Sequence, residues 1–168
     1  SRGIRNETSE KPQRGERKVA HSFVKILVHV VFSTRDREPS IEIGFRARLL
    51  EYLGGIVRAN GGHALAINGM ADHVHILMTL PADKSIADMM RLIKSNSSRW
   101  VHETLSNQKN FSWQTGYSAF SVSQSAIQRV SKYIAEQEKH HAKLPFQDEY
   151  RELLTLHGLS FDEKYVWG

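Results

Sequence analysis

The 168-residue sequence contains no cysteine. This absence excludes disulfide bonds, thiolate zinc sites and cysteine nucleophiles, and it fits a reducing compartment. A bound metal would therefore need nitrogen and oxygen ligands. The sequence also lacks a run approaching the roughly 20 apolar residues of a membrane span and an N-terminal apolar segment typical of secretory signals. We therefore expect a cytoplasmic protein without membrane association.

Positive charge exceeds negative charge, with a net charge of +5 and a pI near 9.6. A basic domain favours an anionic partner, of which nucleic acid is the commonest. Residues 1–20 hold six Lys and Arg against three Glu and almost no large apolar side chains, so burial cannot offset their ordering entropy. We expect a flexible basic arm over 1–20, either a solvated tail or a DNA-contacting segment, and one domain over 21–168.

Strand and helix patterns alternate along the rest of the chain. Strands are predicted where β-branched and aromatic residues cluster or alternate, over 25–34, 63–70, 73–80 and 111–123. Helices are predicted from apolar spacing and capping residues over 43–60, 85–105, 125–141 and 146–157. The order β-α-β-β-α-β followed by helices predicts an α+β fold, a ferredoxin-like or RRM-like split βαβ antiparallel sheet with helices on one face and a further C-terminal helix.

The strand over 73–80 carries two histidines, His73 and His75, one residue apart. Because side chains alternate along a strand, both imidazoles point to the same face, while Val74 and Ile76 point to the other, toward a helix. The pair can present two neutral nitrogen ligands to a metal. Many such pairs only make hydrogen bonds, so the pattern alone does not identify a metal site.

A second pattern pairs Tyr133 with Gln137 on the helix over 125–141, where the i to i+4 spacing stacks the two side chains. A glutamine oxygen can add a neutral ligand to a metal bound by two histidines, and the phenol would lie near the same ion. Most tyrosines with this spacing are packing residues. A metal beside a phenol would nevertheless suit phosphodiester cleavage, which needs charge neutralisation and an in-line nucleophile.

Five linked segments give these patterns a context: VHVVFSTRDREP at 28–39, NGMADHVHILMTLP at 68–81, KSNSSRW at 94–100, WQTGYSAFSVS at 113–123 and VSKYIAEQEKHH at 130–141. In this order they resemble the HUH-superfamily single-tyrosine transposases of bacterial insertion sequences that move as single strands. The resemblance covers about residues 22–157. Asn96 stands where we expect a glycine in this family.

The resemblance implies a catalytic role for each patterned residue. His73, His75 and Gln137 would bind Mg²⁺ or Mn²⁺, and Tyr133 would be the nucleophile on a C-terminal catalytic helix. The enzyme would recognise hairpins in single-stranded DNA and would cleave and rejoin strands through a covalent 5′-phosphotyrosine intermediate. The resemblance also implies a homodimer in which the tyrosine helix of one chain docks onto the metal site of its partner.

Further candidates for DNA contact are basic or aromatic side chains: Arg14, Arg17, Lys18, Lys94, Arg99 and Trp113. Basic side chains bind phosphates without sequence preference, and an aromatic ring can stack on an unpaired base. A solvated face or a place in the core explains them equally well. His140 and His141 could be additional ligands, but we interpret them as residues that interact with the dipole and the last carbonyls of their helix.

Two other functions fit parts of the sequence. A hairpin-binding module on the same fold, without turnover, would keep the DNA-binding surface but needs none of the four site residues. A relaxase or replication initiator would use the same chemistry, and a third histidine would normally lie near the pair. The sequence around His73 and His75 lacks that histidine, which favours the transposase.

Overall fold

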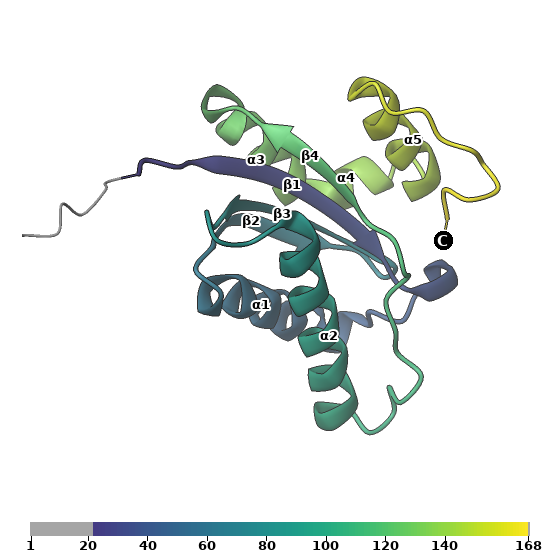
Figure 1. Cartoon of the computed structure of the whole chain (residues 1–168). Coiled ribbons are helices and arrows are strands. Elements are labelled where there is room, and N and C mark those ends of the chain that lie inside the picture. The colour runs from purple at the N-terminus through teal and green to yellow at the C-terminus, as the bar shows by residue number, and fades with distance from the viewer. Residues whose placement is uncertain (1–21, 168) are drawn as a thin grey trace, which may run out of the picture.

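The computed structural model describes residues 22–167, so the predicted basic arm lies outside the described residues. The sheet has four antiparallel strands in the order β2-β3-β1-β4. Strand β1 (Ile26–Ser33) pairs with β3 (His73–Leu80) on one side and β4 (Ser118–Val122) on the other, and β2 (His63–Gly69) forms the outer edge beyond β3. The predicted α+β ferredoxin-like fold is confirmed (Figure 1).

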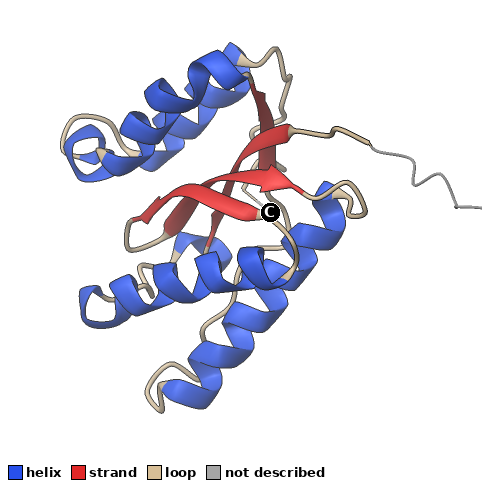
Figure 2. Ribbon diagram, turned by 90° about the vertical axis from the view of Figure 1, so that its left-hand side faces the viewer, coloured by secondary structure: helices blue, strands red, loops and turns tan. Residues whose placement is uncertain are grey.

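Helices lie on both faces of this sheet (Figure 2). Helices α1 (Ile43–Ala59) and α2 (Ile86–Thr104) cover one face, and the C-terminal helices α3 (Ile127–Ala135), α4 (Gln137–His141) and α5 (Phe146–Leu156) cover the other. Short 3-10 turns follow β1 and β4, at Arg35–Arg37 and Gln124–Ala126. Within residues 22–167, no helix combines the length and hydropathy needed to cross a membrane.

Side chains of the two central strands, β1 and β3, alternate between the faces of the sheet, and each face has its own hydrophobic core. Val30 of β1 and Ile76 of β3 pack with α1 and α2 in the larger core. Val31 points the other way and packs with Phe120 of β4 and the apolar side of α5 in the smaller core. Because His73 and His75 alternate with Val74 and Ile76, the histidines lie on the face of the smaller core. The predicted direction of Val74 and Ile76 toward helices is confirmed.

The strand predicted over 111–123 is shorter than expected. Only 118–122 form β4, and the preceding residues make a single isolated bridge, between Thr34 and Trp113. The ammonium group of Lys94 donates to the carbonyl oxygens of Thr115 and Gly116, at 2.9 and 3.0 Å. A side chain thus satisfies carbonyls that a sheet neighbour would otherwise pair, so the segment needs no strand partner.

Helix α2 accommodates Asn96 without a break. The Asn96 amide donates to the carbonyl of Leu92 at 2.9 Å, within a helix that runs uninterrupted from Ile86 to Thr104. The neighbouring Ser97 is buried and accepts a hydrogen bond from the indole nitrogen of Trp113 at 2.9 Å. This part of α2 therefore anchors the segment that leads into β4.

The single helix predicted over 125–141 is divided at Glu136 into α3 and α4. Glu136 has φ −95° and ψ 21°, outside the regular helical range. The side-chain amide of Asn68, on β2, donates to the carbonyls of Ile134 and Ala135 at 3.0 and 3.1 Å. Because a side chain from the sheet satisfies these carbonyls, the helix can end there. Tyr133 and Gln137 consequently lie on two different helices.

Candidate active site

The two histidines of β3 are fully buried under the C-terminal helices, and each has one ring nitrogen engaged. His73 Nδ1 lies 2.6 Å from the carboxylate of Asp72, and His75 Nδ1 lies 3.0 Å from Nε2 of His29 on β1. The other ring nitrogen of each, Nε2, is buried without a hydrogen-bond partner among residues 22–167. Two orphaned nitrogens on neighbouring side chains are the first sign of a binding site.

The engaged nitrogens determine which ring nitrogen carries the proton. The Asp72 carboxylate only accepts, so His73 donates from Nδ1 and keeps a lone pair on Nε2. We infer the same tautomer for His75, with Nδ1 donating to His29. Such partners fix the orientation of metal-binding imidazoles in known sites. The arrangement thus aims two Nε2 lone pairs into the same space.

Burial keeps His29 and His75 neutral. Burial lowers the pKa of His29 to about 4 from its ordinary 6.5, more than the nearby Glu149 carboxylate raises it. Burial also lowers the pKa of His75 well below 6.5, and the adjacent His73 and His29 lower it further. At neutral pH both rings are uncharged, the state in which an imidazole can bind a cation.

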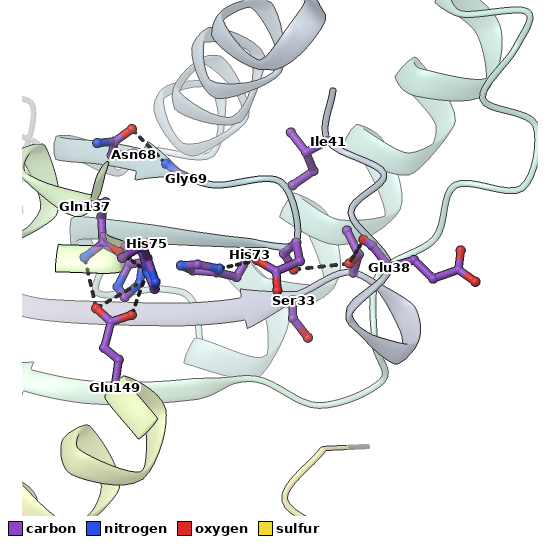
Figure 3. A network of polar contacts seen from close by, with 12 residues as sticks. Ser33, Glu38, Ile41, Asn68, Gly69, His73, His75, Gln137 and Glu149 are labelled. Carbon is purple, nitrogen blue, oxygen red and sulfur yellow. Dashed lines mark hydrogen bonds and ion pairs between the residues drawn. The ribbon is translucent and has the colours of Figure 1, made fainter. Parts of the chain in front are cut away.

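Glu149, on α5, supplies a buried carboxylate to the same space. Its Oε1 lies 3.8 Å from His75 Nε2, and one ligand atom from each of His73, His75 and Glu149 lies within 4.8 Å of the others. Figure 3 shows Glu149 reaching toward His75 from its own helix, with Gln137 beside it. Two imidazole nitrogens and one carboxylate oxygen form a donor set suited to a divalent cation.

Tyr133 lies at the edge of this cluster and donates its phenol hydrogen to Glu149 Oε1. Its ring centroid is 5.9 Å from that of His75 and 6.2 Å from that of His29, both edge-on. Burial, followed by the hydrogen bond and charge of Glu149, raises the pKa of Tyr133 above its ordinary 10.0. The phenol is therefore protonated at neutral pH and already bonded to a group that can accept its proton.

Gln137 is buried between Glu149 and His141. Its amide nitrogen donates to Glu149 Oε1 at 3.1 Å, and its oxygen lies 3.0 Å from His141 Nε2. The structure thus brings Gln137 into the cluster, with its oxygen directed at His141.

His141 is part of the cluster, so its interpretation as a helix-end residue alone is wrong. His141 Nε2 lies 2.9 Å from Glu149 Oε2. The His141 ring also contacts the His73 ring edge-on, with centroids 4.6 Å apart. Burial opposes its charge, but the Glu149 carboxylate raises the pKa of His141. Burial likewise opposes ionisation of Glu149, yet His141 and His75 bring the pKa of Glu149 down to about 2. A negative charge is thus maintained beside the orphaned nitrogens.

Sequence reasoning missed Glu149, although a signal exists. The apolar side of α5 consists of Phe146, Tyr150, Leu153 and Leu154. Glu149 interrupts this side, three residues after Phe146 and four before Leu153. A carboxylate on the buried side of an amphipathic helix needs a partner, which makes it a candidate site residue.

The predicted DNA contacts lie apart from this cluster. Lys94 is half-buried and bonded to backbone carbonyls, and Arg99 is exposed on α2, across the sheet from the site. Trp113 is only 7% exposed and packs against Phe32 and Phe111 in the larger core, which leaves little ring surface for a base. Arg14, Arg17 and Lys18 lie outside the described residues.

The sequence is similar to those of known transposases. A family model described as "Transposase IS200 like" matches residues 22–137. The chain is similar to the ISDra2 transposase TnpA of Deinococcus radiodurans, with 24% identity over 114 residues, which are 65% of this chain and 81% of that protein.

Two solved structures share the fold. A putative transposase from Deinococcus radiodurans matches with a TM-score of 0.59 and 23% identity, over 73% of this chain and 98% of that one. A REP-associated tyrosine transposase bound to a REP hairpin matches with a TM-score of 0.53 and 17% identity, over 88% and 93%. Since the family model spans more than half of the sequence, the chain belongs to the IS200-like family of single-tyrosine transposases, enzymes that cut and join DNA strands.

Proposed function

We propose that this transposase recognises hairpins in single-stranded DNA and cleaves and rejoins strands through a covalent 5′-phosphotyrosine link on Tyr133. The observation that carries the proposal is the convergence of a phenol, two orphaned imidazole nitrogens and a carboxylate on one face of the sheet. The hairpin bound by the similar REP-associated transposase supports a hairpin substrate.

A divalent cation, Mg²⁺ or Mn²⁺, fits the donor set that His73, His75 and Glu149 provide. The orphaned Nε2 atoms and the ionised carboxylate are what such an ion requires, and their burial would be costly without one. When bound, the ion supplies charge neutralisation at the phosphate and aligns the bond to be broken.

Gln137 is the third metal ligand that the family resemblance implies. Its oxygen faces His141, while its nitrogen donates to Glu149. We therefore propose that Glu149 is the third ligand and that Gln137 orients it. The Mn²⁺ affinity of Glu149→Gln distinguishes the two assignments.

The cleavage step follows from the hydrogen bond between Tyr133 and Glu149. The phenol oxygen forms a bond to phosphorus as the bond from phosphorus to the 3′ oxygen breaks, and the phenol proton passes to Glu149 Oε1. The 3′ oxygen leaves with a proton from solvent as a free hydroxyl. Rejoining reverses these transfers, and the phosphotyrosine preserves the energy of the broken bond, so no ATP is needed.

A covalent adduct tests this proposal. Incubation of the protein with an end-labelled hairpin oligonucleotide and Mg²⁺ should yield an adduct that survives denaturing electrophoresis. Tyr133→Phe should form none, because the nucleophilic oxygen is absent. The matched control is Tyr165→Phe, which removes the hydroxyl of an exposed tyrosine and should leave adduct formation unchanged.

The outcomes separate the candidate functions. An adduct that persists in Tyr133→Phe would contradict the assignment of the nucleophile. Salt-sensitive hairpin binding without any adduct would instead support the hairpin-binding module without turnover.

A further inference from the structure

Two hollows border the Tyr133 side chain and open next to the candidate active site. The first, here called the β4 hollow, lies between β4, α3 and α5. The second, the α4 hollow, lies between α4, the residues that follow it and α5. Each has a volume of about 470 Å³, within the usual range for small-ligand sites. Tyr133, Leu153 and Leu156 line both, so the same wall separates them.

The two hollows have matching chemistry. Both contain imidazoles: His29 and His157 line the β4 hollow, and His140 lines the α4 hollow. The His157 ring stacks on Phe120 with centroids 4.2 Å apart, and the His140 ring lies 4.9 Å from that of Tyr133. Each hollow also contains one exposed cation, Arg129 or Lys143. Flat rings, aliphatic walls and a nearby cation are the features that hold unpaired nucleotides.

On the basis of the proposed function, we propose that these hollows hold the bases of the two nucleotides flanking the phosphate that Tyr133 attacks. A strand with its phosphate at the phenol must pass over the shared wall, with one nucleotide on each side. Leu156 lines both hollows and is 78% exposed. Its side chain is therefore available to contact bound DNA rather than the core.

The lining favours bases over phosphates as the occupants. The carboxylates of Glu149 and Glu152 line the α4 hollow and would repel a phosphate, whereas a base, thymine included, can donate an N–H to Glu152. Ser121 and Ser123 offer hydroxyls to a base edge in the β4 hollow. Arg129 and Lys143 are then left for the phosphates further along the strand.

Binding measured without cleavage tests this assignment. A short fluorescein-labelled oligothymidylate is compared with an abasic strand of equal length and charge, by fluorescence anisotropy in EDTA. Leu156→Ala should weaken binding of the oligothymidylate about fivefold, as expected for partial loss of one base contact, and should leave the abasic strand unaffected. Arg129→Gln should weaken binding of both strands alike. The matched control is Ile43→Ala, which truncates an 82% exposed apolar side chain on α1, across the sheet, and should change neither.

Equal effects of Leu156→Ala on both strands, or no effect on either, would overturn the base-binding role of the hollows. The adduct assay on the unaltered protein keeps this failure distinct from failure of the proposed function. If the adduct forms while the base dependence is absent, the hollows are wrongly assigned and the nucleophile stands. If the protein binds neither strand and forms no adduct, both proposals fail.

Discussion

At the residue scale, the site depends on histidines that stay neutral in the folded protein. His29 accepts a hydrogen bond from His75 only while its own Nε2 is unprotonated, and burial lowers the pKa of His29 to about 4. The unfolded chain, in contrast, exposes this ring to water and protonates it near its ordinary pKa of 6.5. Folding and protonation of His29 therefore oppose each other below that value.

The free energy of unfolding should consequently fall with acidification. Because the pKa of His29 is lower in the folded state, its contribution is fully present above pH 6.5 and is lost as the pH falls toward 4, by up to about 3 kcal/mol. Urea unfolding of His29→Gln at about pH 7.5 and 5.5 should show a smaller decrease than the unaltered protein. His141, with a raised pKa, acts in the opposite direction but is common to both proteins.

The matched control for this measurement is His63→Gln, the same substitution at an exposed strand position. His63→Gln should keep the pH dependence of the unaltered protein. If His29→Gln also keeps it, the buried ring does not carry the acid sensitivity.

Glu149 can be separated from Gln137 as a metal ligand by direct binding. Calorimetric titration of the metal-free protein with Mn²⁺ should show at least roughly tenfold weaker binding for Glu149→Gln, because the substitution removes the negative charge at nearly constant volume. Glu138→Gln, an identical change at an exposed position of α4, should bind as the unaltered protein does. Unchanged Mn²⁺ affinity in Glu149→Gln, with loss in His73→Ala, would leave Gln137 as the third ligand.

The individual site residues were predictable to different degrees. His73 and His75 share a face because strand side chains alternate, a local rule that needs no tertiary information. Glu149 and His141 join them only because α5 folds back over the sheet, and local periodicity does not specify which helix covers which strand. The same limit applies to Trp113, whose aromatic and polar neighbours in sequence did not reveal its place in the larger core.

At the element scale, the division between α3 and α4 orients the catalytic side chains. Strands and helices followed from apolar spacing, but this break did not, because it depends on Asn68, which is remote in sequence. An unbroken helix would stack Tyr133 and Gln137 in register. The break instead allows Tyr133 to reach Glu149 while Gln137 lies between Glu149 and His141.

Removal of the Asn68 side chain should disturb both stability and catalysis. Asn68→Ala leaves two carbonyls of α3 without their donor, which should reduce the free energy of unfolding by about 1–2 kcal/mol and slow adduct formation. Asn60→Ala removes the comparable bond from an asparagine amide to a carbonyl at the end of α1, 2.8 Å long and away from the site. It should reduce stability by about 1 kcal/mol without slowing the adduct. Equal rates in the two variants would show that the break does not position Tyr133.

At the scale of the whole molecule, the sheet separates helices that form the larger core from helices that carry the site residues. Helices α1 and α2 cover the larger core. On the other face of the sheet, which holds His73 and His75, α3 contributes Tyr133, α4 contributes Gln137 and His141, and α5 contributes Glu149. His73, His75, Tyr133 and Glu149 of one chain lie close enough together to form a site. Tyr133 already contacts Glu149 and the histidines of its own chain, so we expect an active site formed within a single protomer, in contrast to the composite dimer that the resemblance implies.

Mixing two inactive variants decides between these arrangements. His73→Ala lacks a metal ligand and Tyr133→Phe lacks the nucleophile, so with sites inside one chain their mixture should form no adduct. If sites are shared between chains, exchange would restore about a quarter of the sites. The control mixes unaltered protein with the double variant His73→Ala/Tyr133→Phe. Single-chain sites predict that the unaltered protein keeps its full activity in this mixture, whereas shared sites predict a loss, because every mixed dimer would lack one half of each site.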